Sequence, residues 1–384
     1  MARNIRVAII GAGIGGLAAA GALRQHGFEV VVYERAPALG EVGAGIQLGP
    51  NAVKVLRALG IEQALRPLAS EPANYVSLAW DDAHLRYREP LKAIYETQFG
   101  APYLMVHRAD LHRLLCERLP PNSIRLDACC TGVTCTAGPA VANFADGIQI
   151  EADVVVGADG INSTVRESLF GAQPVRFTQQ MAWRCIVPIE LVPTQVGISR
   201  NEYVGWIGPD GHVICYPIRG GALYNIFAGH VTDQWVDESW AVASSVDELL
   251  VGYRSWNPAL LEMLGKVSEC YKWGIRDRDP LPRWTAGSVT LLGDAAHPMM
   301  PTLAQGAAIS LEDGFALARN LAQHRDDPAR GLVAYEAERR PRASRVVLQA
   351  REQFQNNRKN PAPPPLSRDW IFAHDATADA VPVG

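Results

Sequence analysis

The 384-residue chain has no cluster of basic residues and no long uninterrupted apolar run. Lys and Arg number 36 against 40 Asp and Glu, which gives a net charge of −4. Binding to a phosphate backbone requires clustered Lys and Arg, so we expect no nucleic-acid partner. A transmembrane helix needs about 20 consecutive apolar residues. Because no apolar stretch of that length runs without glycine, we expect no membrane partner either.

Cysteine is also scarce, with seven residues at scattered positions. Their spacing fits no zinc or other metal site, so no bound metal is expected. An odd number of scattered cysteines is typical of reduced thiols in a cytoplasmic protein. What the chain does have is 48% hydrophobic residues. Its length predicts two or three globular domains.

The first glycine-rich motif follows an apolar, β-branched stretch at residues 5–10. Gly11, Gly13 and Gly16 match the pattern G-x-G-x-x-G. The first glycine permits a tight turn, the second lets a pyrophosphate approach the backbone, and the third lets a helix pack closely on the strand. The second predicted strand ends at Glu34, whose carboxylate can bind ribose hydroxyls. The motif therefore predicts dinucleotide binding and leaves NAD and FAD both open.

Two further glycine-containing turns follow predicted buried strands, at residues 157–160 and 293–294. Glycine at such a turn lets backbone atoms contact a ligand. Asp294, in the second turn, can bind a second ribose. The helix that follows the loop at 304–308 can offer free backbone N–H groups to an anion or a ring oxygen. Taken alone, Asp159 and Asp294 also fit the alternative of ordinary turn aspartates.

The three motifs in this order resemble those of the single-component FAD-dependent aromatic hydroxylases, a family of flavoprotein monooxygenases. The resemblance covers nearly the whole chain and implies that the first motif binds a resident FAD. It also implies NADH or NADPH as a transient reductant without a Rossmann domain of its own. Carrying the family's motifs over residue by residue gives these candidate cofactor contacts: Gly11, Gly13, Gly16, Glu34, Arg35, Gly43, Ala44, Gly45, Gln47, Arg108, Asp159, Asp294, Gln305, Gly306, Ala307 and Ala308.

The resemblance predicts an α/β fold: a Rossmann-like FAD-binding domain with an inserted, mainly antiparallel β-sheet substrate domain and C-terminal helices. The alternation and the aromatic residues of the middle segment predict half-buried antiparallel strands that would cover the flavin and form a pocket. The last residues, from 376, are expected to be loose. The predicted parts are a discontinuous FAD-binding domain at 1–72, 98–175 and 281–330, a substrate domain at 73–97 and 176–280, and a C-terminal helical region and tail at 331–384.

The stretch at 203–228 resembles substrate-domain strands of salicylate hydroxylases, 3-hydroxybenzoate 6-hydroxylases and 6-hydroxynicotinate 3-monooxygenases. His212 and Tyr216 match a His and a Tyr that line the substrate site in the last two groups. Their even spacing places both on one face of a strand. His212 is the candidate catalytic base for a phenolic proton, and Tyr216 could orient the phenol or relay that proton. A structural histidine and a core tyrosine are the alternative interpretations.

Gln47, Pro301 and Thr302 are expected to line the substrate pocket, and the last two depart from the family's patterns. Thr302 stands where salicylate hydroxylases and 6-hydroxynicotinate 3-monooxygenases carry a His. Pro301 stands where 3-hydroxybenzoate 6-hydroxylases carry a Gln. No group's site is therefore reproduced intact, which puts decarboxylative hydroxylation in doubt. His297, in the same loop, is more typical of a packing residue near the flavin than of an acid or base.

The activity implied by the resemblance is hydroxylation of a small phenolic or hydroxypyridine carboxylic acid. In this family NAD(P)H reduces the flavin, O₂ adds to it, and the resulting flavin hydroperoxide hydroxylates the ring. A homodimer is implied through the C-terminal region. A flavin-dependent reductase or oxidase without oxygen insertion remains an alternative, as does a non-catalytic flavoprotein sensor, because a fold alone does not establish a reaction. The sequence names no partner for the substrate carboxylate.

Overall fold

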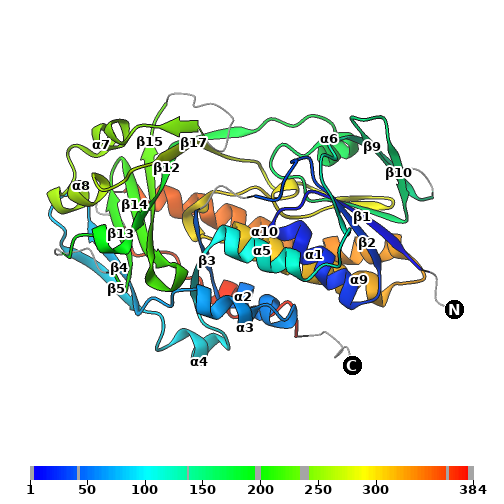
Figure 1. The fold of residues 1–384 in the computed structure, drawn as a ribbon, viewed down its shortest axis with the longest axis horizontal. Helices are drawn as coiled ribbons and strands as arrows, with labels where there is room; N and C mark the ends of the chain where they lie inside the picture. Colours follow the sequence, from blue (N-terminus) through cyan, green and yellow to red (C-terminus); the bar gives the residue numbers. More distant parts are fainter. Residues whose placement is uncertain are drawn as a thin grey trace.

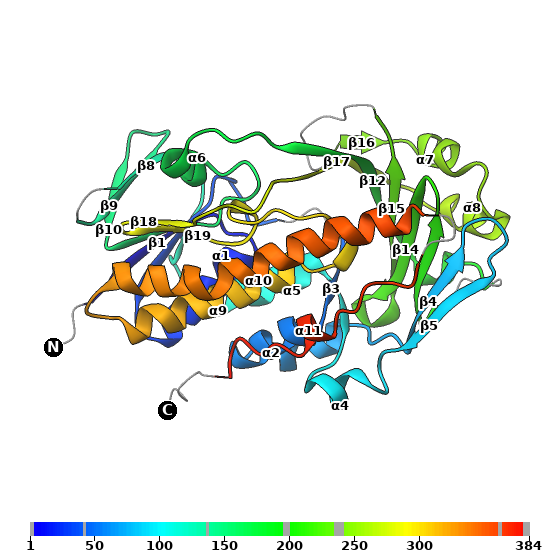
Figure 2. The ribbon, with the colours of Figure 1, turned by 180° about the vertical axis from the view of Figure 1, so that it is seen from behind.

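A computed structural model describes residues 4–40, 44–135, 138–194, 200–233, 242–359 and 363–378. Two large sheets lie toward opposite ends of the molecule, and the long helix α10 (Pro328–Asn357) runs alongside both (Figures 1 and 2). The combination of a mainly parallel sheet, a mainly antiparallel sheet and C-terminal helices confirms the predicted fold class. Within the described ranges, no helix is long and apolar enough to span a bilayer. The division into domains stays a prediction.

The six-stranded sheet is mainly parallel and buried. β1 pairs in parallel with both of its neighbours, whereas the edge strand β18 runs antiparallel to β19. Parallel strands are covered on both faces, which is why they read as nearly continuous apolar runs in the sequence. In spatial order, the strands are β18 (Thr285–Ala286), β19 (Val289–Leu291), β11 (Val154–Gly157), β1 (Arg6–Ile10), β2 (Glu29–Tyr33) and β7 (Ile124–Arg125).

Helices α1 (Ile14–Gln25) and α9 (Gly306–Gln323) pack tightly against each other beside this sheet. Small residues make the close approach possible. A Cβ atom added to Gly314 of α9 would lie only 2.7 Å from the backbone nitrogen of Ala19 in α1. The tight packing fixes the two helices relative to each other, and the N-terminal residues of both reach the same cavity.

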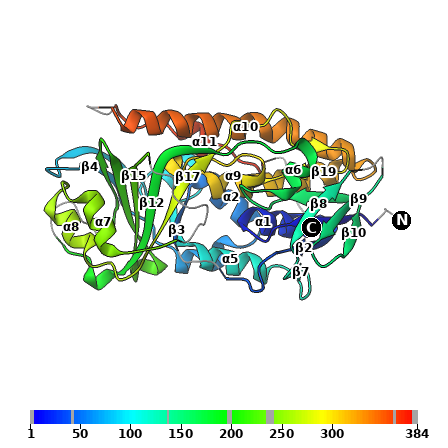
Figure 3. The ribbon, with the colours of Figure 1, turned by 90° about the horizontal axis from the view of Figure 1, so that it is seen from above.

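The eight-stranded sheet lies at the other end of the molecule (Figure 3). Neighbouring strands in it are antiparallel, with the exception of the parallel pair β13 and β4. In spatial order, the strands are β16 (Val242–Ser244), β17 (Cys270–Asp277), β12 (Arg176–Pro188), β15 (Leu223–Val231), β14 (Gly211–Ile218), β13 (Tyr203–Gly208), β4 (Asn74–Ala79) and β5 (Leu85–Pro90).

Two helices in the middle of the chain, α7 (Val246–Tyr253) and α8 (Pro258–Leu264), correct the prediction of strands throughout 176–280. Each begins with a residue type that caps helices. The side chain of Ser245 accepts a hydrogen bond from the backbone of α7, and that of Asn257 does the same for α8. Such caps replace hydrogen bonds that a helix N-terminus lacks. The capping signals were present in the sequence, and the strand interpretation overlooked them.

These two helices cover one face of the eight-stranded sheet, and β14 shows how its two faces differ. Val213 and Cys215 pack in a hydrophobic core with residues of α7 and α8. His212, Ile214 and Tyr216, on the opposite face, line a cavity. The prediction of half-buried strands is therefore wrong for the centre of this sheet, where β13 is buried along its whole length. Both faces are covered, one by helices and the other by the rest of the molecule.

The remaining elements connect these layers. A three-stranded sheet flanks the six-stranded sheet, and a short two-stranded ribbon lies between the two large sheets (Figure 1). The remaining elements are β3 (Gly45–Leu48), β6 (Leu104–His107), β8 (Cys130–Thr134), β9 (Ala140–Phe144), β10 (Gln149–Ala152), α2 (Pro50–Ala58), α3 (Glu62–Leu65), α4 (Tyr95–Phe99), α5 (Arg108–Glu117), α6 (Thr164–Phe170) and α11 (Asp369–Phe372).

The chain after α10 turns back along the molecule and is held by cationic side chains. The ammonium of Lys54 donates to the three backbone carbonyls at 372–374, each at 3.2 Å. Arg319 donates to the carbonyl of Ala376 at 2.7 Å, and Ala376 is buried. The expectation that the chain is loose from 376 onward is therefore wrong for Ala376. Residues 379–384 lie outside the described ranges.

A buried ion cluster joins α9 to α10. Arg339 donates to Asp313 Oδ1 at 2.9 Å and to Glu312 Oε2 at 2.7 Å, and all three side chains are fully buried. Burial alone would raise the pKa of Glu312, but the charges of Arg339 and Arg342 outweigh it and lower that pKa to about 2. The second oxygen of Asp313 lies 2.5 Å from Nε2 of His297. One cluster therefore holds two helices and the loop that precedes α9.

Replacing Arg339 with Met should lower the free energy of unfolding by about 3–5 kcal/mol, because two carboxylates would stay buried without their main partner. Urea unfolding followed by circular dichroism at neutral pH measures this. The matched control is Arg113→Met, which removes an exposed pair with Glu117. That control should cost less than about 1 kcal/mol. Equal losses in the two variants would contradict the importance of the cluster.

Candidate active site

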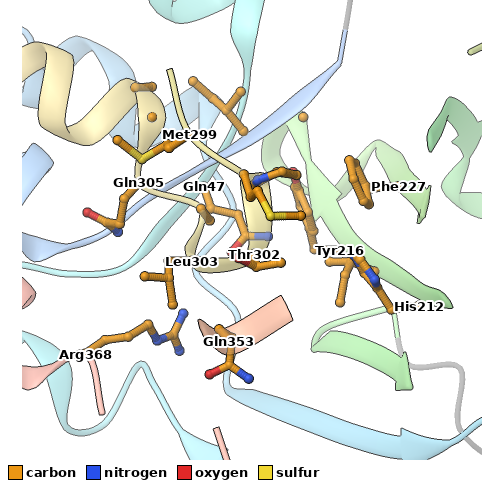
Figure 4. A pocket seen from close by; sticks show the side chains of 18 of the residues that line it. Gln47, His212, Tyr216, Phe227, Met299, Thr302, Leu303, Gln305, Gln353 and Arg368 are labelled. Carbon is orange, nitrogen blue, oxygen red and sulfur yellow. The ribbon is translucent and has the colours of Figure 1, made fainter. Parts of the chain in front are cut away.

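A cavity of about 510 Å³ lies between the two large sheets. Its walls come from the N-termini of α1 and α9, strand β3, the loop before α9, one face of the eight-stranded sheet and the C-terminal segment at 363–368 (Figure 4). Enclosed spaces with a few polar groups among apolar walls are typical of small-molecule sites. Elements from the whole length of the chain therefore meet at one place.

The glycines of the first motif serve two different purposes. A Cβ atom on Gly11 would lie 2.4 Å from the carbonyl oxygen of Ala158, and one on Gly16 would lie 2.1 Å from the carbonyl oxygen of Gly11. The fold itself thus requires glycine at both positions. A Cβ on Gly13 would meet no atom within 4 Å, and Gly13 lines the cavity. It precedes α1 without any side-chain cap, so the first N–H groups of the helix are open to an anionic ligand.

The N-terminus of α9 also lacks a side-chain cap and reaches the cavity. Gln305 precedes this helix without a side-chain cap, and a Cβ on Gly306 would meet nothing within 4 Å. The amide oxygen of Gln305 accepts from Asn51 at 3.0 Å, but its buried Nε2 has no hydrogen-bond partner among the described residues. Gln305, Gly306 and Ala307 line the cavity, whereas Ala308 is buried behind them. An extended dinucleotide with a polar ring system, such as FAD, fits these two sets of free donors.

Glu34 and Arg35 do not line the cavity. The two carboxylate oxygens of Glu34 accept hydrogen bonds from the backbone nitrogens of Ala12 and Ala36, at 2.8 and 2.9 Å. Glu34 therefore ties the glycine-rich turn to the end of β2. Arg35 is exposed beside it. Contacts of these two residues with the adenosine half of a cofactor stay a prediction.

Asp159 is also absent from the cavity wall, although its neighbours Ala158 and Gly160 line it. Its carboxylate accepts from the hydroxyl of Ser163 at 2.5 Å and from the backbone nitrogen of Val165 at 3.1 Å. Burial raises the pKa of Asp159, and these hydrogen bonds act in the opposite direction. Asp159 therefore holds the start of α6, and its contact with a cofactor stays a prediction.

Asp294 and Arg108 both line the cavity. Burial raises the pKa of Asp294, while the charges of His297 and Arg108 lower it. The backbone nitrogen of Arg108 donates to the carbonyl of Ala44 at 2.9 Å, which fixes β3 against the start of α5. Gly43 lies outside the described residues.

His212 and Tyr216 lie on the cavity face of β14, as their even spacing predicts. The ring of His212 stacks on Phe227, with centroids 5.5 Å apart and planes inclined by 22°. Among the described residues its ring nitrogens have no hydrogen-bond partner. Burial lowers the pKa of His212 to about 4 and raises the pKa of Tyr216. At neutral pH the cavity therefore presents a neutral imidazole and a protonated phenol.

Gln47 forms the centre of a group of phenols at the base of the cavity. Its amide oxygen accepts a hydrogen bond from Tyr103 Oη at 2.8 Å. Burial raises the pKa values of Tyr203 and Tyr216, and a hydrogen bond to Gln47 partly offsets that effect at both. Several polar hydrogens are thus held in place beside Tyr216.

Pro301 and Thr302 line the cavity, and their contact with a substrate stays a prediction. The hydroxyl of Thr302, however, donates to the carbonyl of Ala350 in α10 at 2.6 Å. Thr302 therefore ties the loop to α10 and does not replace the acid–base function of a histidine. His297 is buried against Asp313 and is not part of the cavity wall, which agrees with its interpretation as a packing residue.

Several residues of the cavity wall were not predicted from the sequence. Asn225 accepts a hydrogen bond from the backbone nitrogen of Gly45 at 2.7 Å and so joins β3 to the eight-stranded sheet. The alternation along β15, which places Asn225 and Phe227 on one face, was a usable signal. Gln353 and Arg368 reach the cavity from α10 and from the segment after it. No periodicity in that proline-rich segment marks Arg368, so only the fold reveals its position.

Replacing His212 with Asn should reduce the acid sensitivity of the protein. The ordinary pKa of 6.5 applies to the unfolded chain, whereas the folded value is about 4. Between these values the unfolded chain binds a proton that the folded chain does not, so stability falls as the pH falls. The free energy of unfolding in urea is measured for both proteins at about pH 8 and pH 5. Between these pH values it should fall by about 2 kcal/mol more in the wild type than in the variant. An unchanged difference would contradict a depressed His212 pKa.

Comparison with known proteins identifies the family. The FAD binding domain model matches residues 4–350. A 6-hydroxynicotinate 3-monooxygenase of Pseudomonas fluorescens is 40% identical over 352 residues, with 90% of both chains covered. A 3-hydroxybenzoate 6-hydroxylase of Klebsiella oxytoca is 36% identical over 357 residues, with 92% of this chain and 88% of the relative covered.

Among solved structures, a salicylate hydroxylase substrate complex superposes with a TM-score of 0.83 at 28% identity. The superposition covers 98% of this chain and 97% of the other. The resemblance inferred from the motifs is therefore confirmed, as is FAD as the cofactor. The chain belongs to the FAD binding domain family and is an FAD-dependent aromatic-ring monooxygenase of that family.

Proposed function

We propose that this enzyme uses NADH or NADPH and O₂ to hydroxylate a small phenolic or hydroxypyridine carboxylic acid. The observation that carries the proposal is the single cavity that joins the open N-termini of α1 and α9 to the aromatic face of β14. Relatives named for 6-hydroxynicotinate and 3-hydroxybenzoate support this substrate class. Their names as a monooxygenase and a hydroxylase favour oxygen insertion over a reductase or oxidase. The homodimer and the cytoplasmic location stay predictions.

FAD would lie along the open helix N-termini. The backbone around Gly13 would hold the pyrophosphate, with Glu34 and Arg35 near the adenosine. The N-terminus of α9, together with Asp294 and Arg108, would hold the ribityl chain and the ring system. Bound and reduced, FAD supplies the activation of O₂ and the transfer of one oxygen atom. The remaining tasks, which are to orient the ring, exclude water and accept a proton, belong to this chain.

His212 would orient the ring hydroxyl by accepting its hydrogen bond. A pKa of about 4 makes His212 a weak base toward a resting phenol, whose pKa is about 10. Electrophilic attack on the ring withdraws electron density from the hydroxyl oxygen and makes its proton far more acidic. His212 therefore takes the proton as the new C–O bond forms. Tyr216, protonated at neutral pH, would donate a hydrogen bond to the same oxygen.

The proposed function is tested with the FAD-loaded enzyme, NADH or NADPH, and 6-hydroxynicotinate, 3-hydroxybenzoate or salicylate under ¹⁸O₂. At least one ring should accelerate coenzyme oxidation and appear with one ¹⁸O atom by mass spectrometry. Nicotinate and benzoate are matched controls, since they lack the activating hydroxyl and should give no hydroxylated product. Peroxide as the sole product from every ring would contradict this assignment.

Gly13→Ala should weaken FAD retention without harming the fold, because the added methyl group enters the open space where the pyrophosphate is expected and meets no protein atom. Gly16→Ala is the matched control. Its methyl group would collide with the carbonyl of Gly11, so this variant should lose thermal stability. Flavin absorbance per protein and thermal unfolding without added FAD measure the two effects. Full FAD retention in Gly13→Ala would contradict the proposed pyrophosphate position.

A further inference from the structure

We propose that Arg368 binds the carboxylate of the aromatic acid and makes the enzyme select acids over neutral rings. The inference rests on the proposed function, and it names the carboxylate partner that the sequence did not supply. It further assigns the substrate class as ring acids whose hydroxyl lies across the ring from the carboxylate.

Arg368 lines the same cavity as His212, and the two side chains lie on opposite sides of it (Figure 4). Gln353 lies on the Arg368 side and accepts a hydrogen bond from the backbone nitrogen of Leu366 at 2.7 Å, which fixes the approaching segment. A ring placed between the two sides would direct one substituent to each.

The segment that carries Arg368 is held rigidly. Arg368 directly precedes α11, whose residue Phe372 packs among the rings of Tyr95, Phe99 and Tyr103. The carbonyls of this helix accept hydrogen bonds from two side chains already tied into the core. These bonds come from Arg342 to Ile371 at 3.0 Å and from Lys54 to Phe372 at 3.2 Å. A fixed guanidinium loses little further freedom when a ligand binds.

Among the residues that the structure describes, no carboxylate lies at hydrogen-bond distance from the guanidinium of Arg368. Its side chain is 13% exposed, shares a hydrogen bond with Tyr103 and lies over the ring of Phe372, with its guanidinium carbon 5.2 Å from the ring centroid. Among the described residues its carboxylate partner is Glu89, whose Oε2 lies 3.7 Å from Nη2, beyond hydrogen-bond length. Glu89 also accepts a hydrogen bond from Tyr95. Burying a charge without full pairing is unfavourable, so a planar carboxylate that meets the guanidinium fork would be bound strongly.

The other cations of the cavity wall also have contacts within the protein. Arg184 lies over the ring of Trp273, with its guanidinium carbon 4.1 Å from the ring centroid. Arg86 is directed to the carbonyl of Ile207 at 3.5 Å. Arg108 lowers the pKa of Asp294, on the side where the flavin is expected. Arg368 is the cation that faces His212 across the cavity.

The test compares 6-hydroxynicotinate with 6-hydroxynicotinamide, which has the same ring and no charge. In the FAD-loaded enzyme, Arg368→Met should raise KM for the acid about 10- to 100-fold and change KM for the amide less than about threefold. Arg368→Lys keeps the charge without the fork, so its KM for the acid should lie between those of wild type and Arg368→Met. This variant carries the test if Arg368→Met fails to retain FAD.

Arg345→Met is the matched control. It removes the same type of side chain beside α11, but Arg345 is exposed and stacks on Trp370 outside the cavity, 3.8 Å from the ring centroid. Both KM values should stay at those of wild type. Equal changes for acid and amide in Arg368→Met would show a merely structural role and overturn the proposal, and so would no change for either.

Binding separates this inference from the proposed function. If wild type hydroxylates no ring, dissociation constants for the same acid and amide are measured from changes in the flavin absorption spectrum. Acid-selective binding that disappears in Arg368→Met would support Arg368 even though the proposed activity had failed. Absence of acid binding in wild type, or equal acid binding in Arg368→Met, would overturn it.

Discussion

The buried pairing of Arg339 with Glu312 and Asp313 is the interaction on which the arrangement of the active site depends. Asp313 holds His297, and with it the loop before α9, while Glu312 holds Arg342, whose guanidinium also fixes the backbone of α11. Removing charges from water is unfavourable unless every partner is present. The cluster therefore joins α9 to α10, and Arg342 connects it to the C-terminal segment. These connections bring the loop before α9 and Arg368 to one cavity.

Burial then sets the chemistry of that cavity. The centre of the eight-stranded sheet is covered on both faces, so the groups on its inner face lose contact with water. Desolvation leaves His212 neutral and Tyr216 protonated near neutral pH, which gives one acceptor and one donor on the same face of β14. The helix N-termini on the opposite wall contribute positive potential without titratable groups. The positive potential of the helix N-termini therefore suits an anionic cofactor. The acceptor and the donor on β14 suit a neutral ring hydroxyl.

Much of the fold and of the candidate site was predictable from local patterns in the sequence. The glycine motifs, the buried parallel strands and the common face of His212 and Tyr216 follow from period and turn chemistry. The helices α7 and α8 were missed although Ser245 and Asn257 are capping residues. The pairing of Arg339 with Asp313 and the reach of Arg368 into the cavity are contacts between distant segments. No local periodicity encodes such contacts. For the same reason, the hydrogen bond from Thr302 to Ala350 of α10 could not be predicted from the sequence.

The decisive measurement is a structure of the FAD-loaded enzyme with a bound ring hydroxy acid. We expect the flavin to lie along the open N-termini of α1 and α9, with the substrate ring beside it. The hydroxyl of that ring should lie within hydrogen-bond distance of His212 or Tyr216, and the carboxylate should lie against the guanidinium of Arg368. A carboxylate bound instead to Arg184 or Arg108, with its hydroxyl pointing away from β14, would contradict the account.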